Sequence, residues 1–174
     1  MNSTIVNQTS VLQIVPGTES LIIPACGEMR NFSESTSLFP GGTDSDFQEW
    51  NIDGVQDDPT PQMVTSVWEL IRDANFEEML NSLDRNLIDN FLTKTQAITW
   101  LELYPEHRHP QGWATFLPLK VKRERDKYDF FVAGALLYGS GLRAGVRRFE
   151  YGDHWGAESR RRLVLPQLVP LVPA

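Results

Sequence analysis

The spacing of apolar residues changes along this chain, and that change limits the folds open to it. Residues 1–60 show no helical period, residues 61–94 carry apolar side chains three and four positions apart, and from Gln96 apolar and polar residues alternate. The first spacing is typical of amphipathic helices and the second of strands. Helices and strands in separate stretches predict an α+β fold. We therefore expect two amphipathic helices packed on a roughly four-stranded antiparallel sheet, with an extended N-terminal arm and an extended C-terminal tail.

The two helices are predicted from their start signals. Pro61 fits the first position of a helix, which we expect to run to about Asp73. Asn75 with Glu78 has the form of a capping box and predicts a second helix that ends near Lys94. The strand candidates that follow are 97–104, 113–121, 128–138 and 146–151.

The 174 residues suffice for one domain with appendages. We expect an acidic arm over 1–60, a core over 61–162 and an apolar, proline-rich tail over 163–174. Nine acidic residues and one basic residue lie in the first 60 positions, whereas the rest of the chain has 14 acidic and 15 basic residues. The net charge of −7 argues against nonspecific binding of the whole molecule to nucleic acid or to anionic membrane.

The arm carries isolated aromatic anchors on an irregular chain. Val11–Val15 and Ser20–Ile23 flank a Pro-Gly turn, which predicts a possible short hairpin. Disordered segments have few aromatic residues, so the anchors indicate that the arm docks either onto a partner or over its own core. The anchors are Phe32, Phe39, Phe47 and Trp50.

The tail combines prolines with leucines and valines, whose apolar side chains are unfavourable in water. Its prolines exclude a regular helix and disfavour a central strand. Its apolar side chains predict either folding back over the sheet or insertion into a partner, and the sequence favours the partner. The expected contacts are Leu163, Leu165, Leu168 and Leu171.

Candidate chemistry is sparse. Glu106, His107 and His109, with Asp153 and His154, have donor atoms suited to zinc or iron, but Pro105 and Pro110 predict a solvated loop there. The glycines between Gly139 and Gly145 do not match a phosphate-binding pattern and predict a hairpin loop. Cys26, the single cysteine, excludes an internal disulfide. We predict no catalytic residue, no cofactor and no metal.

Basic residues concentrate in the second half. From Tyr104 onward there are 12 basic and seven acidic residues, with Tyr128, Tyr151 and Trp155 nearby. This pattern fits either a nucleic-acid surface or a face that meets an acidic protein surface. Acidic residues interleaved among 122–127 favour the protein surface.

These features predict a non-enzymatic structural protein of a large symmetric particle. We expect a virion or phage component, such as a capsid accessory, neck or tail protein, that binds other subunits, including copies of itself, through its arm and tail. One alternative is a small acidic inhibitor or regulator of a nucleic-acid-handling enzyme, and another is a metal-dependent enzyme that uses His107 and His109. Met1 is followed by neither a basic nor an apolar leader, and the longest apolar run is too short for a membrane helix, so we expect the virion or the cytoplasm.

Overall fold

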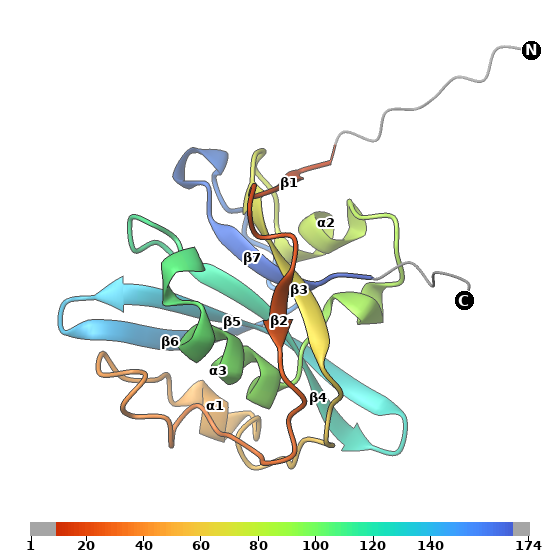
Figure 1. The fold of residues 1–174 in the computed structure, drawn as a ribbon, viewed down its shortest axis with the longest axis vertical. Helices are drawn as coiled ribbons and strands as arrows, with labels where there is room; N and C mark the ends of the chain where they lie inside the picture. The colour runs from red at the N-terminus through yellow and green to blue at the C-terminus, as the bar shows by residue number, and fades with distance from the viewer. Residues whose placement is uncertain (1–9, 169–174) are drawn as a thin grey trace, which may run out of the picture.

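The computed structural model describes residues 10–168, which form a strand-rich molecule (Figure 1). Seven strands make one mixed sheet in the order β1-β3-β7-β4-β5-β6, with β2 also paired to β3. All the pairs are antiparallel except β4 with β7, which is parallel. The strands are β1 (Leu12–Ile14), β2 (Leu21–Ile23), β3 (Met63–Leu70), β4 (Thr115–Glu124), β5 (Lys127–Tyr138), β6 (Gly141–Arg148) and β7 (Arg162–Pro166), and the α-helices are α1 (Asp46–Glu49), α2 (Phe76–Asn81) and α3 (Lys94–Leu103).

The prediction of two helices on a four-stranded antiparallel sheet is therefore wrong, and the first error lies at residues 61–73. This stretch is not a helix: it contains β3, which has β1 and β2 on one edge and β7 on the other. Met63, Val67 and Leu70 have helical spacing, but the segment also carries the β-branched residues that suit a strand packed on both sides. Pairing on both edges outweighs the helical spacing from which the helix was predicted.

The second error lies between residues 75 and 104. Asn75 does cap a helix, and its side chain accepts a hydrogen bond from the Glu78 amide, but α2 ends at Asn81. A 3₁₀ turn at Leu87–Asn90 follows, and the strand expected at 97–104 is instead α3. Thr93 and Gln96 form a complete capping box that starts this helix.

The predicted strands at 113–121 and 128–138 correspond to β4 and β5, and the strand expected at 146–151 begins earlier, as β6. β5 and β6 form a tight hairpin in which Tyr138 pairs with Gly141, as the glycines of this loop predict. These three strands form the half of the sheet that carries the candidate site.

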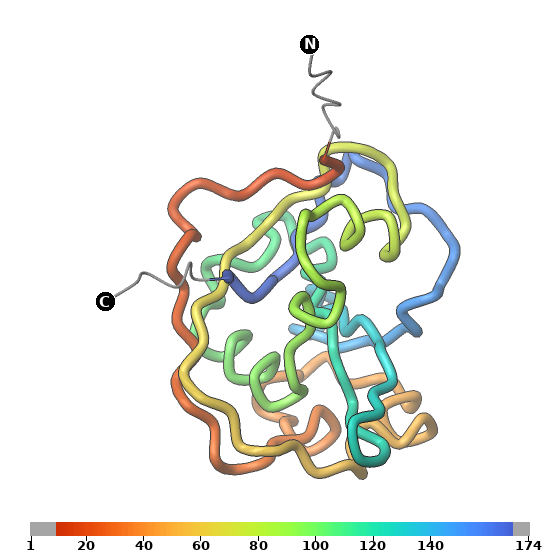
Figure 2. The backbone as a smooth tube through the Cα atoms, turned by 90° about the vertical axis from the view of Figure 1, so that its right-hand side faces the viewer, coloured from red at the N-terminus to blue at the C-terminus, as the bar shows by residue number. Residues whose placement is uncertain are grey.

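Residues 10–60 are part of the fold. β1 and β2 do not form the predicted hairpin, because each pairs with β3 and not with the other; Figure 2 shows the red segment following the yellow β3 along its length. Residues 24–60 then cover one face of the sheet together with α3. The ammonium group of Lys94 holds this layer by donating hydrogen bonds to the backbone oxygens of Ile52, Asp53 and Val55.

The sheet has an apolar core on each face, and the two faces are covered unequally. The first face is closed by α3 and by residues 24–60 (Figure 1). The second face meets α2, whose six residues bring Phe76, Met79 and Leu80 onto only part of it. The rest of the second face, over β4, β5 and β6, is left open.

None of the helices within residues 10–168 combines the length and the apolar character needed to cross a membrane.

Candidate functional site

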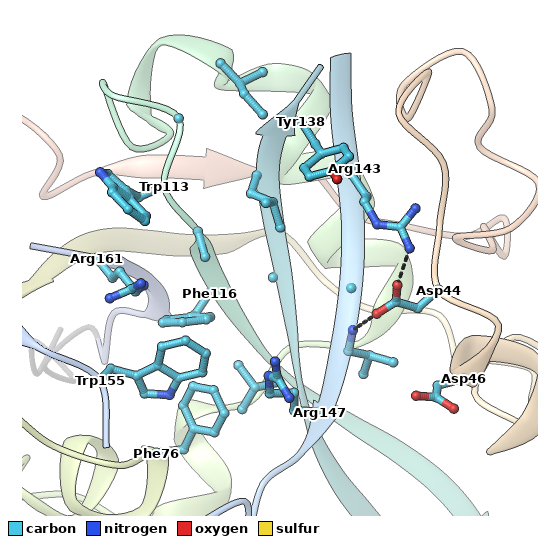
Figure 3. A pocket seen from close by; sticks show the side chains of 18 of the residues that line it. Asp44, Asp46, Phe76, Trp113, Phe116, Tyr138, Arg143, Arg147, Trp155 and Arg161 are labelled. Atoms are coloured by element: carbon cyan, nitrogen blue, oxygen red, sulfur yellow. Dashed lines mark hydrogen bonds and ion pairs between the residues drawn. The ribbon is translucent and has the colours of Figure 1, made fainter. Parts of the chain in front are cut away.

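The open part of the second face is a groove of about 980 Å³ (Figure 3). Side chains alternate along a strand, so when Leu142, Ala144 and Val146 of β6 enter the core of the first face, Arg143 and Arg147 project to the second. β4 contributes Phe116 to the floor by the same rule. Beyond the strands, the wall is made by Phe76, Trp113, Trp155 and Arg161.

Two glycines hollow the middle of this floor. Gly134 of β5 and Gly145 of β6 pair directly across the two strands. Neither projects a side chain into the groove. A Cβ at Gly134 would lie 3.6 Å from the Phe116 ring, an ordinary contact distance, whereas a Cβ at Gly145 would lie 2.8 Å from the Asp44 carboxylate. The depth of the groove thus depends on the absence of side chains at one cross-strand pair.

Aromatic rings and guanidinium groups alternate along one wall. The Arg161 Cζ atom lies 5.2 Å from the centroid of the Trp113 ring and 4.9 Å from that of Trp155. The Arg147 Cζ atom lies 5.6 Å from the Trp155 centroid and 4.5 Å from that of Tyr151. We call the series Trp113, Arg161, Trp155, Arg147 and Tyr151 the cation–π ladder. The N–H donors of a guanidinium group lie in its own plane, so an arginine that contacts an aromatic face can still donate hydrogen bonds to another partner.

The two arginines of the ladder differ from a third arginine in the same groove. Arg143 forms an ion pair with Asp44, its Nη2 atom lying 2.6 Å from Oδ1, and the other carboxylate oxygen accepts a hydrogen bond from the Val146 amide. Arg147 and Arg161 form no ion pair within residues 10–168. Burial lowers the pKa of Arg161, and the nearby Glu158 carboxylate opposes this shift without forming an ion pair. The Arg161 guanidinium also donates a hydrogen bond to the Ser159 hydroxyl.

Two loops present the upper end of the ladder, and His109 joins them. Gly112 adopts φ +80°, and its carbonyl accepts a hydrogen bond from the Leu137 amide, which directs the following Trp113 toward the groove. The Nε2 atom of His109 lies 2.6 Å from the backbone oxygen of Ser159, and the Nδ1 atom accepts a hydrogen bond from the Gln111 amide. These partners require a neutral ring with its proton on Nε2. Neutral His109 therefore ties the Trp113 loop to the loop that carries Arg161.

The predicted partner-binding aromatic residues of the arm lie inside the chain's own fold. Phe32, Phe39 and Phe47 are buried in the core of the first face, and the Phe32 ring stacks on Phe47 with centroids 4.3 Å apart. Trp50 is half-buried and stacks on Phe131. The sequence leaves open whether these residues dock onto a partner or over the chain's own core, and in the structure they pack over the core.

The predicted contacts of the tail divide in three ways. Leu163 and Leu165 are buried in β7, which lies between β3 and β4 in the sheet. Leu168 is exposed. Leu171 lies outside the described residues.

The histidines are dispersed rather than gathered. The Nε2 atom of His107 lies 3.6 Å from Oε1 of Glu106, and the Nε2 atom of His154 lies 2.6 Å from Oε1 of Glu78. His109 is buried between the two loops. In the part of the chain that the structure describes, no group of three or more His, Cys, Asp or Glu side chains is placed to hold a metal ion.

The basic residues singled out from the sequence also separate. Arg123 forms an ion pair with Asp129 and donates hydrogen bonds to the backbone oxygens of Trp50 and Asn51. Lys122 forms an ion pair with Asp58. Arg147 and Arg161 enter the groove, where Trp155 joins them. The sequence did place Tyr151 and Trp155 near basic residues, but it did not single out Trp113, Phe116 or Gly134.

Comparison with known protein families, with curated proteins and with solved structures gave no match.

Proposed function

We propose that this protein acts by binding an anionic organic ligand in the groove. The ligand's anionic group is held by Arg147 and Arg161, and its apolar part lies against Trp155 and Phe116. The observation that carries the proposal is the cation–π ladder, in which two guanidinium groups are ordered by aromatic rings but form no ion pair among the described residues.

The energetics favour such a ligand. Burial partly desolvates Arg161, which forms no ion pair among the described residues, and an incoming anion would offset that cost. Hydrogen bonds to charged groups contribute about 1.5–3 kcal/mol. The aromatic wall supplies the apolar contact that most pockets use for affinity, while the arginines set orientation. The volume of the groove lies at the upper end of the range for small-ligand sites.

The proposal keeps the non-catalytic role expected from the sequence and moves the binding surface. Phe32, Phe39 and Phe47 hold the fold together, so the groove replaces the arm as the surface offered to a partner. Assembly into a larger particle remains a proposal from the sequence, and it would use this surface.

The test uses anilinonaphthalene sulfonate, which joins planar rings to one sulfonate and fluoresces when its rings leave water. We expect saturable binding by the native protein and a dissociation constant raised about tenfold in R147Q and in R161Q, which each lose a charge-assisted hydrogen bond. R125Q removes the same charge from the exposed β4–β5 turn and serves as the matched control.

A second variant tests the place of binding without removing charge. Gly134→Val puts a side chain on the groove floor, at a strand position that favours β-branched residues, so thermal stability is expected to hold while dye binding falls. Equal dissociation constants in native protein, R147Q, R161Q and Gly134→Val, or no saturable binding at all, would overturn the proposal.

A further inference from the structure

One end of the groove continues into an exposed apolar surface. Trp113, Leu137 and Tyr138 are 49%, 59% and 68% exposed, and Figure 3 shows Trp113 and Tyr138 at the upper end of the groove. Leu137 and Tyr138 leave β5 on opposite sides. Leu137 reaches this end of the groove beside the Trp113 loop, where its amide donates a hydrogen bond to the Gly112 carbonyl. We call these three residues the apolar ledge.

The ledge indicates a ligand larger than the groove. A small molecule held at Arg147 and Arg161 would leave side chains this exposed in water. Clustered exposed apolar residues beside polar ones usually mark a protein-binding surface. Trp, Tyr and Arg, the residue types of the ledge and the ladder, are also those that dominate binding energy in protein interfaces.

Charge selects the kind of partner. Arg147 and Arg161 form no ion pair among the described residues and suit one or two carboxylates of a ligand. Asp44 and Asp46 line the same groove. A nucleic-acid strand carries a phosphate on every nucleotide, and these phosphates would be repelled by the two carboxylates and by the protein's net charge of −7. Phosphates would also leave the apolar ledge without a partner. The groove therefore matches isolated acidic groups beside apolar ones.

We propose that the groove binds an acidic segment of a partner protein, with a carboxylate side chain at the arginines and a large apolar side chain on the ledge. This inference rests on the proposed function and names its ligand. The Arg161 guanidinium lies 5.2 Å from the Trp113 ring centroid. In an extended chain, side chains two positions apart point the same way and lie about 6.6 Å apart. The segment thus places its acidic residue two positions from an aromatic or large aliphatic residue.

The test compares fluorescein-labelled peptides by anisotropy on the full-length protein. The first carries Phe-Ser-Glu in a Gly-Ser background, the second carries Phe-Ser-Gln, and the third carries Gly-Ser-Glu. We expect the first peptide to bind, and each of the other two to bind about tenfold more weakly, because each loses one anchor. R161Q and Trp113→Ala are expected to weaken the first peptide by a similar factor, and R125Q to leave it unchanged.

Trp113→Ala removes a half-exposed side chain, so its thermal unfolding is measured alongside to show that the fold is kept. Leu137→Ser, on the ledge but outside the ladder, is a second variant that should also weaken the first peptide.

The outcomes separate this inference from the proposed function. If a single-stranded oligothymidylate binds more tightly than the first peptide and depends on Arg147, the partner is a nucleic acid and the inference fails. If the dye binds in an Arg147-dependent way while no peptide binds at millimolar concentration, the ligand is a small anion and the inference again fails. If neither dye nor peptide nor oligonucleotide binds, both proposals fail.

Discussion

At the scale of single residues, Lys94 carries a charge inside the molecule. Its side chain is buried, and its ammonium group donates to the backbone oxygens of Ile52, Asp53 and Val55. Lys94→Met removes the donor and leaves the Asp53 and Val55 oxygens without a partner, while the Ile52 oxygen keeps a hydrogen bond from the Val55 amide. We therefore expect the free energy of unfolding to fall by about 3 kcal/mol in a urea titration. Lys127→Met, at an exposed turn, is the control, with an expected change within about 0.5 kcal/mol. Equal effects of the two substitutions would contradict this account of the buried charge.

His109 makes stability depend on pH. Burial lowers its pKa, with smaller contributions of the same sign from Arg162 and Arg161, and the hydrogen bond to the Ser159 oxygen opposes them. The unfolded chain therefore takes up a proton near pH 6.5, while the folded chain still holds His109 neutral. The stability that this histidine contributes is complete above pH 6.5 and is lost as pH falls below it. We expect the midpoint of urea unfolding to be lower at pH 5.5 than at pH 7.5.

The variant His109→Gln identifies the residue responsible. It keeps a side chain able to hydrogen-bond but cannot take up a proton, so the fall between pH 7.5 and 5.5 should shrink. His107→Gln is the matched control, since His107 is only half-buried and lies beside the exposed Glu106. A pH dependence unchanged in His109→Gln would assign the effect to other groups.

At the scale of elements, the sequence predicts the hairpin of β5 and β6 but not the pairing of β3. β5 and β6 are neighbours in sequence and in the sheet, so alternation and the turn at Gly139 predict the pair, although β6 begins at Gly141 and not at residue 146. β3 pairs with three strands that are distant in sequence, and only those partners decide that Met63–Leu70 is extended. α3 differs from the prediction for another reason: the Thr93–Gln96 capping box starts a helix, whereas the alternation that begins at Gln96 predicts a strand over 97–104.

At the same scale, the predicted partner-binding residues that the structure describes all lie outside the candidate site. Alternation in β6 puts Arg143 and Arg147 on the face opposite Leu142 and Ala144, but the glycines between Gly139 and Gly145 predict a loop there, so Arg143 is not expected on a strand. That the opposite face is open depends on where α2 ends, at Asn81 and not near residue 94. A hydrophobic period does not fix that end. The sequence thus predicts a concentration of basic residues, but not the groove that Arg143, Arg147 and Arg161 line.

At the scale of the whole molecule, the division into arm, core and tail does not match the packing of the chain. Residues 10–60 supply two strands and the buried rings of Phe32, Phe39 and Phe47. Residues 162–166 form β7, which joins β3 to β4 in the middle of the sheet. Without β7 the sheet separates into two halves, because those two strands do not pair with each other.

This packing predicts the behaviour of a fragment of residues 61–162. The fragment lacks both central pairings of β7 and the layer that closes the first face, so we expect it to show no cooperative thermal transition by circular dichroism. A fragment of residues 10–168 keeps every described contact and is expected to unfold cooperatively, within a few degrees of the full chain. Cooperative unfolding by the 61–162 fragment would mean that the arm and tail are accessory to an independent core. The assembly role first predicted for them would then regain its physical basis, since segments that the core does not require are free to bind another subunit.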